Sequence, residues 1–71
     1  MPKPGDLVKD GTDGEIGLVL SVGPGFVVNE CEEYPDGFMP SWKVQWPSMP
    51  YVCDLGEDAL NEGLVRIISK S

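Results

Sequence analysis

The side chains that could do chemistry in this chain of 71 residues are carboxylates and two cysteine thiols, because the sequence contains no histidine. The carboxylates gather mainly in residues 30–36 and 54–62. A pair of carboxylates can act as general acid and general base when its surroundings separate the roles of the two groups. Acids clustered in an open, solvated stretch are not tuned for that work. We therefore predict a protein that is not an enzyme and has no catalytic residue.

The two cysteines, Cys31 and Cys53, do not indicate a nucleophile either. A nucleophilic cysteine needs a base and an electropositive setting, whereas Cys31 lies between Glu30 and Glu32. Cys53 lies in a short apolar run that is typical of a core position. A bridge between the two depends on a distance that sequence does not give. Residues 1–4 do not resemble an export signal, which favours a reducing compartment and free thiols.

Metal binding is the other chemistry that carboxylates could support. Asp10, Asp13 and Glu15 offer three oxygen ligands within six residues, and calcium prefers such ligands. However, these acids do not alternate as they do in an EF-hand loop, so a plain turn is the favoured interpretation. Two cysteines without histidine are too few for a structural zinc site. We expect no metal and no cofactor.

The net charge of −7 narrows the choice of partner. Non-specific binding to nucleic acid depends on lysine and arginine neutralising phosphates, so this charge argues against direct nucleic-acid binding. The same charge disfavours anionic membranes, and no apolar run approaches the roughly 20 residues of a membrane-spanning helix. The acids form either a solvated surface or an attraction for a basic protein partner.

The rest of the sequence indicates short strands separated by glycine and proline. We predict strands over residues 6–9, 15–22, 42–46 and 64–68, with shorter candidates at 26–28 and 51–53. Residues 10–14 form a turn, and residues 54–63 form one helical turn that ends at Gly63. Residues 29–41 show no clean period and contain Pro35 and Pro40, so we interpret them as a long excursion loop.

Two strands have a clear alternation. In residues 15–22, one face carries Ile16, Leu18, Leu20 and Val22, and the other carries Gly17, Val19 and Ser21. Gly17 marks a bulge or a close approach of another segment. In residues 42–46, Trp42, Val44 and Trp46 share one face. The pattern as a whole predicts a single all-β domain over residues 1–71, a small barrel of five to six strands with one helical turn before the last strand.

Four segments carry a resemblance to known proteins: Gly5-Asp6-Leu7-Val8, Gly14-Glu15-Ile16-Gly17-Leu18-Val19, Val44-Gln45-Trp46 and Leu64-Val65-Arg66-Ile67. Their order resembles the Src-homology-3-like (SH3-like) small barrels. Similar patterns occur in a small stromal subunit of photosystem I, in transcription-elongation modules of the KOW type, and in small uncharacterised proteins of tailed bacteriophages. The phage proteins are the most similar in length and in the ending at residues 44–47. The Ala-Leu-Tyr-Asp-Tyr-like segment of the peptide-binding signalling domains is absent.

The resemblance implies the SH3-like fold, and such barrels have many unrelated roles. We predict a non-catalytic protein-interaction module, of the kind found as capsid decoration or cement proteins of phages, located in the virion or the host cytoplasm. The alternative is a small acidic regulatory protein that binds or inhibits a host enzyme or a nucleic-acid-binding protein. Aromatic anchors within a polar rim are typical of interfaces. The predicted partner-binding residues are Phe26, Glu32, Glu33, Tyr34, Phe38, Met39 and Trp42.

Overall fold

The computed structural model describes residues 2–70, which contain seven strands and one short helix. The prediction of an all-β fold is confirmed. The elements in chain order are β1 (Leu7–Asp10), β2 (Ile16–Val22), β3 (Phe26–Val27), β4 (Phe38–Met39), β5 (Ser41–Gln45), β6 (Val52–Gly56), α1 (Glu57–Asn61) and β7 (Val65–Ser69).

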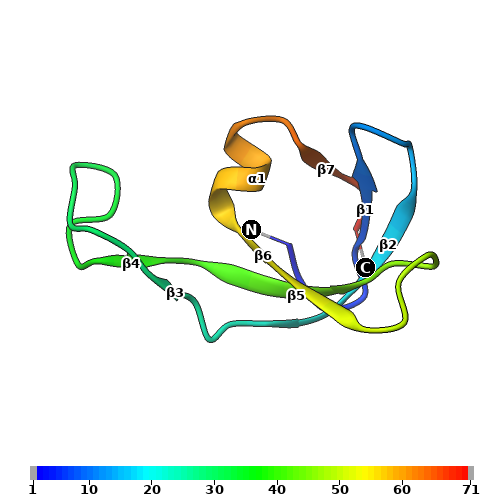
Figure 1. The fold of residues 1–71 in the computed structure, drawn as a ribbon, viewed down its shortest axis with the longest axis horizontal. Helices are drawn as coiled ribbons and strands as arrows, with labels where there is room; N and C mark the ends of the chain where they lie inside the picture. Colours follow the sequence, from blue (N-terminus) through cyan, green and yellow to red (C-terminus); the bar gives the residue numbers. More distant parts are fainter. Residues whose placement is uncertain (1, 71) are drawn as a thin grey trace.

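Five of the strands form one bent antiparallel sheet in the order β6-β5-β2-β1-β7 (Figure 1). The two edge strands, β6 and β7, do not pair with each other in the part of the chain that the structure describes. Closure of the barrel, which the sequence pattern predicted, is therefore not found. α1 follows β6 directly and leads into β7, so it lies at the open side of the sheet (Figure 1).

The turn between β1 and β2 has the form that its sequence predicts. The Asp10 carboxylate accepts hydrogen bonds from the Thr12 hydroxyl at 2.6 Å and from the Thr12 backbone N–H at 2.8 Å. The Asp13 carboxylate accepts one from the Glu15 N–H at 2.9 Å. The Thr12 hydroxyl, followed by the Thr12 N–H, lowers the pKa of Asp10. These carboxylates stabilise a local turn and, among residues 2–70, no group of three metal-ligating side chains is gathered.

The core lies on one side of this sheet. Buried side chains come from every strand of the sheet except β6, together with Trp46 and Ala59 of α1: Val8, Val19, Trp42, Val44, Trp46, Ala59 and Val65. Gly17 confirms the predicted close approach, because a Cβ there would lie 2.6 Å from Val44 Cγ1 and 2.7 Å from the Trp46 ring. The bulge lies between Val19 and Ser21 instead. Glycine at position 17 thus makes room for the tryptophan ring.

The opposite face of β2 carries its larger apolar side chains and is exposed. Ile16 is 46% exposed and Leu18 is 41% exposed, whereas Val19, on the other face, is almost fully buried. The side chains of β2 that face the core are therefore its smaller ones, and the largest core side chains are the two tryptophans. The long apolar side chains of β2 remain at the surface, where they need a separate explanation.

The predicted helical turn is present but shorter than expected. Its first three predicted residues, 54–56, continue β6, and α1 begins at Glu57. Gly63, at φ +76°, ends the helical segment, where the Leu64 N–H donates to the Ala59 carbonyl at 2.9 Å. The buried Ala59 holds α1 against the core, so a helix of five residues is stabilised by packing.

Candidate interaction surface

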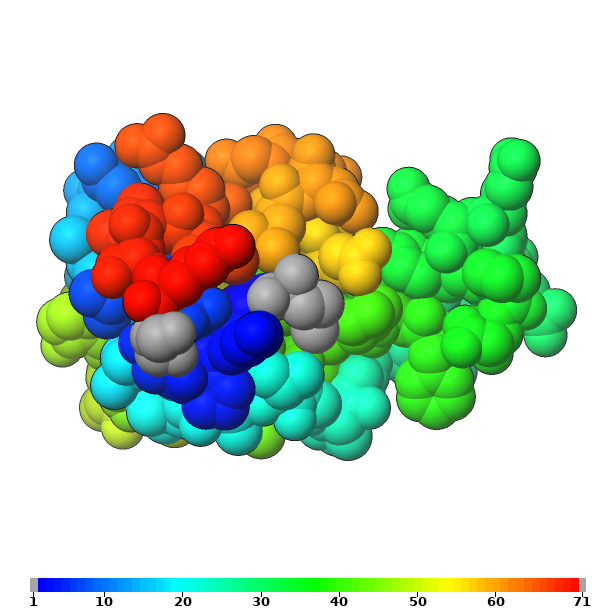
Figure 2. All heavy atoms as spheres, turned by 180° about the vertical axis from the view of Figure 1, so that it is seen from behind, coloured from blue at the N-terminus to red at the C-terminus, as the bar shows by residue number. Residues whose placement is uncertain are grey.

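A two-stranded projection between β2 and β5 stands apart from the five-stranded sheet, and we call residues 26–39 the arm. β3 and β4 pair antiparallel, with Phe26 opposite Met39 and Val27 opposite Phe38. The predicted strand at 26–28 is confirmed for residues 26–27, but the expectation of a strand-free loop over 29–41 is wrong. The arm extends to the left of Figure 1, and its green atoms form a separate lobe in Figure 2.

The base of the arm is attached to the sheet by a small set of contacts. The Gly23 N–H donates to the Ser41 carbonyl and the Gly25 N–H donates to the Ser41 hydroxyl, both at 2.8 Å. A Cβ at Gly56 would lie 2.6 Å from Met39 Sδ and 3.2 Å from Phe26 Cδ2. Phe26 and Met39 therefore pack against the junction of β6 and α1, where only glycine leaves enough room.

The other face of the arm is exposed. Val27 is 82% exposed and Phe38 is 51% exposed, and the two are direct cross-strand partners. Side chains on successive strand residues point to opposite faces, so the Val27–Phe38 pair faces away from the Phe26–Met39 pair. The arm thus presents an apolar pair that contributes nothing to the core cluster.

The tip of the arm is ordered by its own backbone hydrogen bonds. The N–H groups of Cys31 and Gly37 both donate to the Tyr34 carbonyl, at 3.3 and 3.0 Å. Tyr34 is buried, and its hydroxyl has no hydrogen-bond partner among residues 2–70. Burial, followed by the nearby Glu57 carboxylate, raises the pKa of Tyr34. The tip is consequently a compact turn with a buried aromatic ring.

The arm carries four acids at its tip and no base. Glu30, Glu32, Glu33 and Asp36 are exposed, and no lysine or arginine occurs between Lys9 and Lys43. The one ion pair found within residues 2–70 joins Lys43 Nζ to Asp54 Oδ1 at 2.7 Å, on β5 and β6. The carboxylates at the tip are therefore unneutralised, and the Asp36 carboxylate accepts a hydrogen bond from the Phe38 N–H at 3.1 Å.

The structure separates the predicted partner-binding residues into three groups. Glu32, Glu33 and Phe38 are exposed on the arm, and Phe26 and Met39 lie at its base. The prediction is wrong for the remaining two, Trp42 and Tyr34. Trp42 is 0% exposed and belongs to the core, and Tyr34 is buried in the tip, so neither ring is accessible to a partner. Sequence reasoning missed Val27, although its alternation with Phe26 was the available signal.

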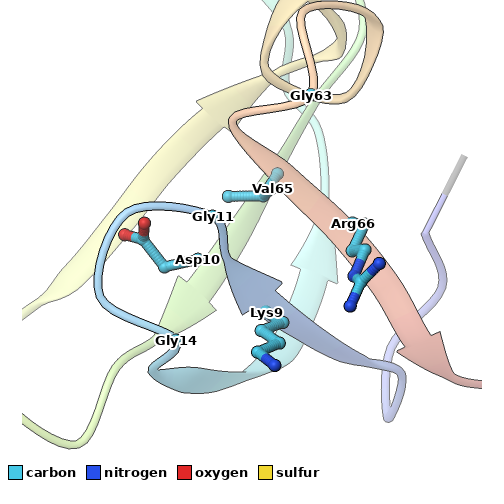
Figure 3. A pocket seen from close by; sticks show the side chains of 7 residues that line it. All are labelled: Lys9, Asp10, Gly11, Gly14, Gly63, Val65 and Arg66. Carbon is cyan, nitrogen blue, oxygen red and sulfur yellow. The ribbon is translucent and has the colours of Figure 1, made fainter.

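Two further features lie outside the predicted set. Both cysteines are free thiols, Cys31 exposed at the tip and Cys53 half-buried in β6. A hollow of about 420 Å³ lies between the β1–β2 turn and β7, lined by Lys9, Asp10, Gly11, Gly14, Gly63, Val65 and Arg66 (Figure 3). No sequence pattern indicates this hollow, because its walls come from opposite ends of the chain.

No helix within residues 2–70 has the length and apolar character needed to cross a membrane. Comparisons with protein-family models, with curated proteins and with solved structures gave no match to this chain. The arm and the hollow are therefore interpreted from their own geometry and charge.

Proposed function

We propose that this protein is a non-catalytic interaction module that docks on a protein partner through its arm. The observation that carries the proposal is the exposed Val27–Phe38 pair, on the same projection as four exposed carboxylates and outside the core. Apolar anchors surrounded by a polar rim are the usual composition of an interface centre.

The defined conformation of the arm supports a docking role. Cross-strand pairing, the hydrogen bonds of the tip and the buried Tyr34 give the arm this conformation in the unbound chain. Association orders flexible side chains and loops at a cost in free energy, and a preorganised surface avoids much of that cost.

We also propose that the five-stranded sheet is an open form of the SH3-like barrel. The strand order β6-β5-β2-β1-β7, with α1 immediately before the last strand, supports an SH3-like barrel whose two edges are left open. Together with the resemblance to small proteins of tailed bacteriophages, it supports a structural protein of the capsid decoration or cement type, acting in the virion. The partner of the arm is then a protein surface that is apolar and has basic residues around it.

One observation favours a second candidate function, a small acidic regulator of a basic enzyme or of a nucleic-acid-binding protein. The segment from Asp10 to Trp42 contains seven acids and no base, which equals the net charge of the whole chain. A surface of that charge attracts a basic site over a distance. Such binding is steeply weakened by salt, whereas apolar docking is not.

The test is to change the Val27–Phe38 pair and leave the sheet alone. We expect the double variant Val27→Ser/Phe38→Ser, which we call the arm variant, to keep the wild-type circular dichroism spectrum and thermal midpoint. When it is immobilised and exposed to a lysate of the native source, it should lose the protein that the wild-type chain retains. Raising the salt concentration in the wild-type experiment separates apolar docking from charge attraction.

The matched control is Tyr51→Ser, which removes another exposed aromatic side chain far from the arm, in the turn between β5 and β6. It should retain the same protein as the wild-type chain. If the arm variant retains that protein as well, the arm is not the docking surface and the proposed function fails.

A further inference from the structure

The exposed face of the five-stranded sheet has an apolar row and a basic row, which run across neighbouring strands. Leu7 lies opposite Leu18, and Gln45, the partner of Leu18 on β5, lies opposite Val52. The second row runs from Ile16 through Lys9 to Arg66. We call this surface the outer face and define it by Leu7, Lys9, Ile16, Leu18, Val52 and Arg66. Contiguous apolar surface on a folded protein can mark an interaction site.

The basic end of the outer face holds two cations side by side. Lys9 and Arg66 are register partners across β1 and β7, and like charges directly opposite each other destabilise a strand pair. Neither makes an ion pair within residues 2–70. Figure 3 shows their side chains at the hollow, while the Asp10 carboxylate is turned away from them and is held by Thr12. This end of the face therefore lacks a negative partner.

The arm has the complementary composition. It combines the exposed Val27–Phe38 pair with four unneutralised carboxylates, whereas the outer face combines an apolar row with two unneutralised cations. Both the apolar part and the charged part of one surface thus find a counterpart on the other. Complementarity of charge determines orientation and selects among partners.

The arm of a given molecule is too far from its own basic row to reach it. The arm joins the Val22 end of β2, whereas Ile16, beside Lys9, begins the other end of that strand. A strand of seven residues spans roughly 20 Å at ~3.3 Å per residue. Figure 1 shows the arm pointing away from the β1–β2 turn. An arm that meets a basic row must therefore belong to another molecule.

We propose that the arm of one copy of this chain docks on the outer face of a second copy, with the acidic tip beside Lys9 and Arg66. This inference rests on the proposed function, because it names the partner of the arm. Two different surfaces meet in such a contact, so copies join head to tail and form a ring or an open filament. The −7 charge of each copy repels over distance, but salt screens that repulsion beyond ~8 Å, while the close contacts persist.

The experiment is sedimentation velocity of the purified chain over a range of concentrations, at low and raised salt. We expect the wild-type chain to form species larger than dimers. The arm variant defined above and a face variant, Lys9→Glu/Arg66→Glu, should each weaken association about tenfold or more. Mixing the two variants should restore association but stop it at a dimer, because each copy then offers one intact surface.

Two controls make the comparison specific. Lys3→Glu/Lys70→Glu changes the net charge as the face variant does, at cations outside the Lys9–Arg66 pair, and should leave association within about twofold. Circular dichroism and thermal melting establish that every variant is folded. A variant that fails to fold is replaced by Val27→Thr/Phe38→Thr for the arm or by Lys9→Gln/Arg66→Gln for the outer face.

Three outcomes would overturn the inference. The first is a wild-type chain that stays monomeric up to ~1 mM, because an affinity below that level is too weak for specific assembly. The second is association that survives in the arm variant but not in the face variant, which would indicate a symmetric contact between outer faces. The third is a mixture of variants that remains monomeric. If the chain is monomeric but the arm variant still loses a protein from the lysate, only this inference fails, and the proposed function stands.

Discussion

The sheet and the arm are both built of antiparallel strands, yet they differ in what holds them together. The sheet packs Val8, Val19, Trp42 and Val44 into a core, where each of these side chains is at most 1% exposed. The arm buries one large side chain, Tyr34, which is 8% exposed, and is otherwise held by backbone hydrogen bonds and by its base. Stability is thus concentrated in the sheet, and exposed apolar side chains with unneutralised acids are concentrated in the arm.

This contrast shows how a chain of this size divides its residues between folding and binding. A small domain buries a limited share of its surface, so few apolar residues can be withdrawn from the core without loss of the fold. Here two tryptophans are the largest side chains of the core. Residues such as Val27, Phe38 and Leu18 are therefore not needed inside and stay at the surface.

The largest effect is expected from removing the ring at the centre of the sheet. Trp42→Ala should lower the free energy of unfolding by about 3–5 kcal/mol, because the buried ring leaves a cavity. That is a large share of the roughly 4–10 kcal/mol available to a domain of this length. Urea denaturation followed by circular dichroism measures it. Phe38→Ala on the arm should change stability by less than ~0.5 kcal/mol. Equal effects in the two variants would contradict the division between sheet and arm.

A smaller effect is expected where the backbone makes room for the core. Gly17→Ala should cost about 1–3 kcal/mol, because the new methyl group would lie 2.6 Å from Val44 Cγ1 and 2.7 Å from the Trp46 ring. The fluorescence of the tryptophans should change as well. Gly63→Ala is the matched control, because nothing lies within 4 Å of a Cβ at this position. Its φ of +76° is strained for alanine, so the variant should lower the free energy of unfolding by about 1–2 kcal/mol. Its tryptophan fluorescence should stay unchanged, and a shift there would refute this distinction.

The smallest effect is expected in the arm and depends on pH. The pKa of Tyr34 is raised in the folded chain, so the folded state holds the phenol proton more tightly than the unfolded state does. The stability that this proton contributes is fully present below the unfolded pKa of about 10 and is lost as pH rises through the folded pKa. In the variant Tyr51→Phe, where Tyr34 is the remaining tyrosine, absorbance of tyrosinate should therefore appear above pH 10. Thermal stability should fall over the same window.

Tyr34→Phe is the control for that pH dependence. It should abolish the loss that Tyr34 causes above pH 10, and at neutral pH it should keep or slightly raise stability, because the hydroxyl it removes is buried without a partner among the described residues. Marked destabilisation at neutral pH would show that the hydroxyl does have a stabilising contact.

The sequence predicts those parts of the fold that depend on local pattern. Alternation in Trp42, Val44 and Trp46 correctly indicates one buried face, and the Asp- and Gly-rich turn correctly reverses the chain after β1. Pairing between distant segments is a different matter. Closure of the barrel depends on whether β6 reaches β7, and α1 separates them. The pairing of β3 with β4 was missed because each strand has only two residues, too few to show a period.

The candidate surfaces were predictable only in part, for the same reason. The acids and Phe38 of the arm are contiguous enough to be recognised from sequence, whereas Trp42 was misassigned because an aromatic residue looks the same in a core and at an interface. The Lys9–Arg66 pair comes from β1 and β7, which meet only in the folded chain. The exposure of Ile16 and Leu18 is equally non-local, since the Trp46 ring beside Gly17 determines which face of β2 is covered.

The attachment of the arm has a consequence for how this protein can change over evolutionary time. The chain leaves the sheet at Gly23 and returns at Ser41, and one hydrogen bond of 2.8 Å joins those two points. Lengthening a connection between fixed ends costs only ~0.6 kcal/mol for each doubling. Segments of different length and chemistry can therefore replace the residues between Gly23 and Ser41 while the sheet is conserved. Related chains can thus acquire new binding specificities without loss of the fold.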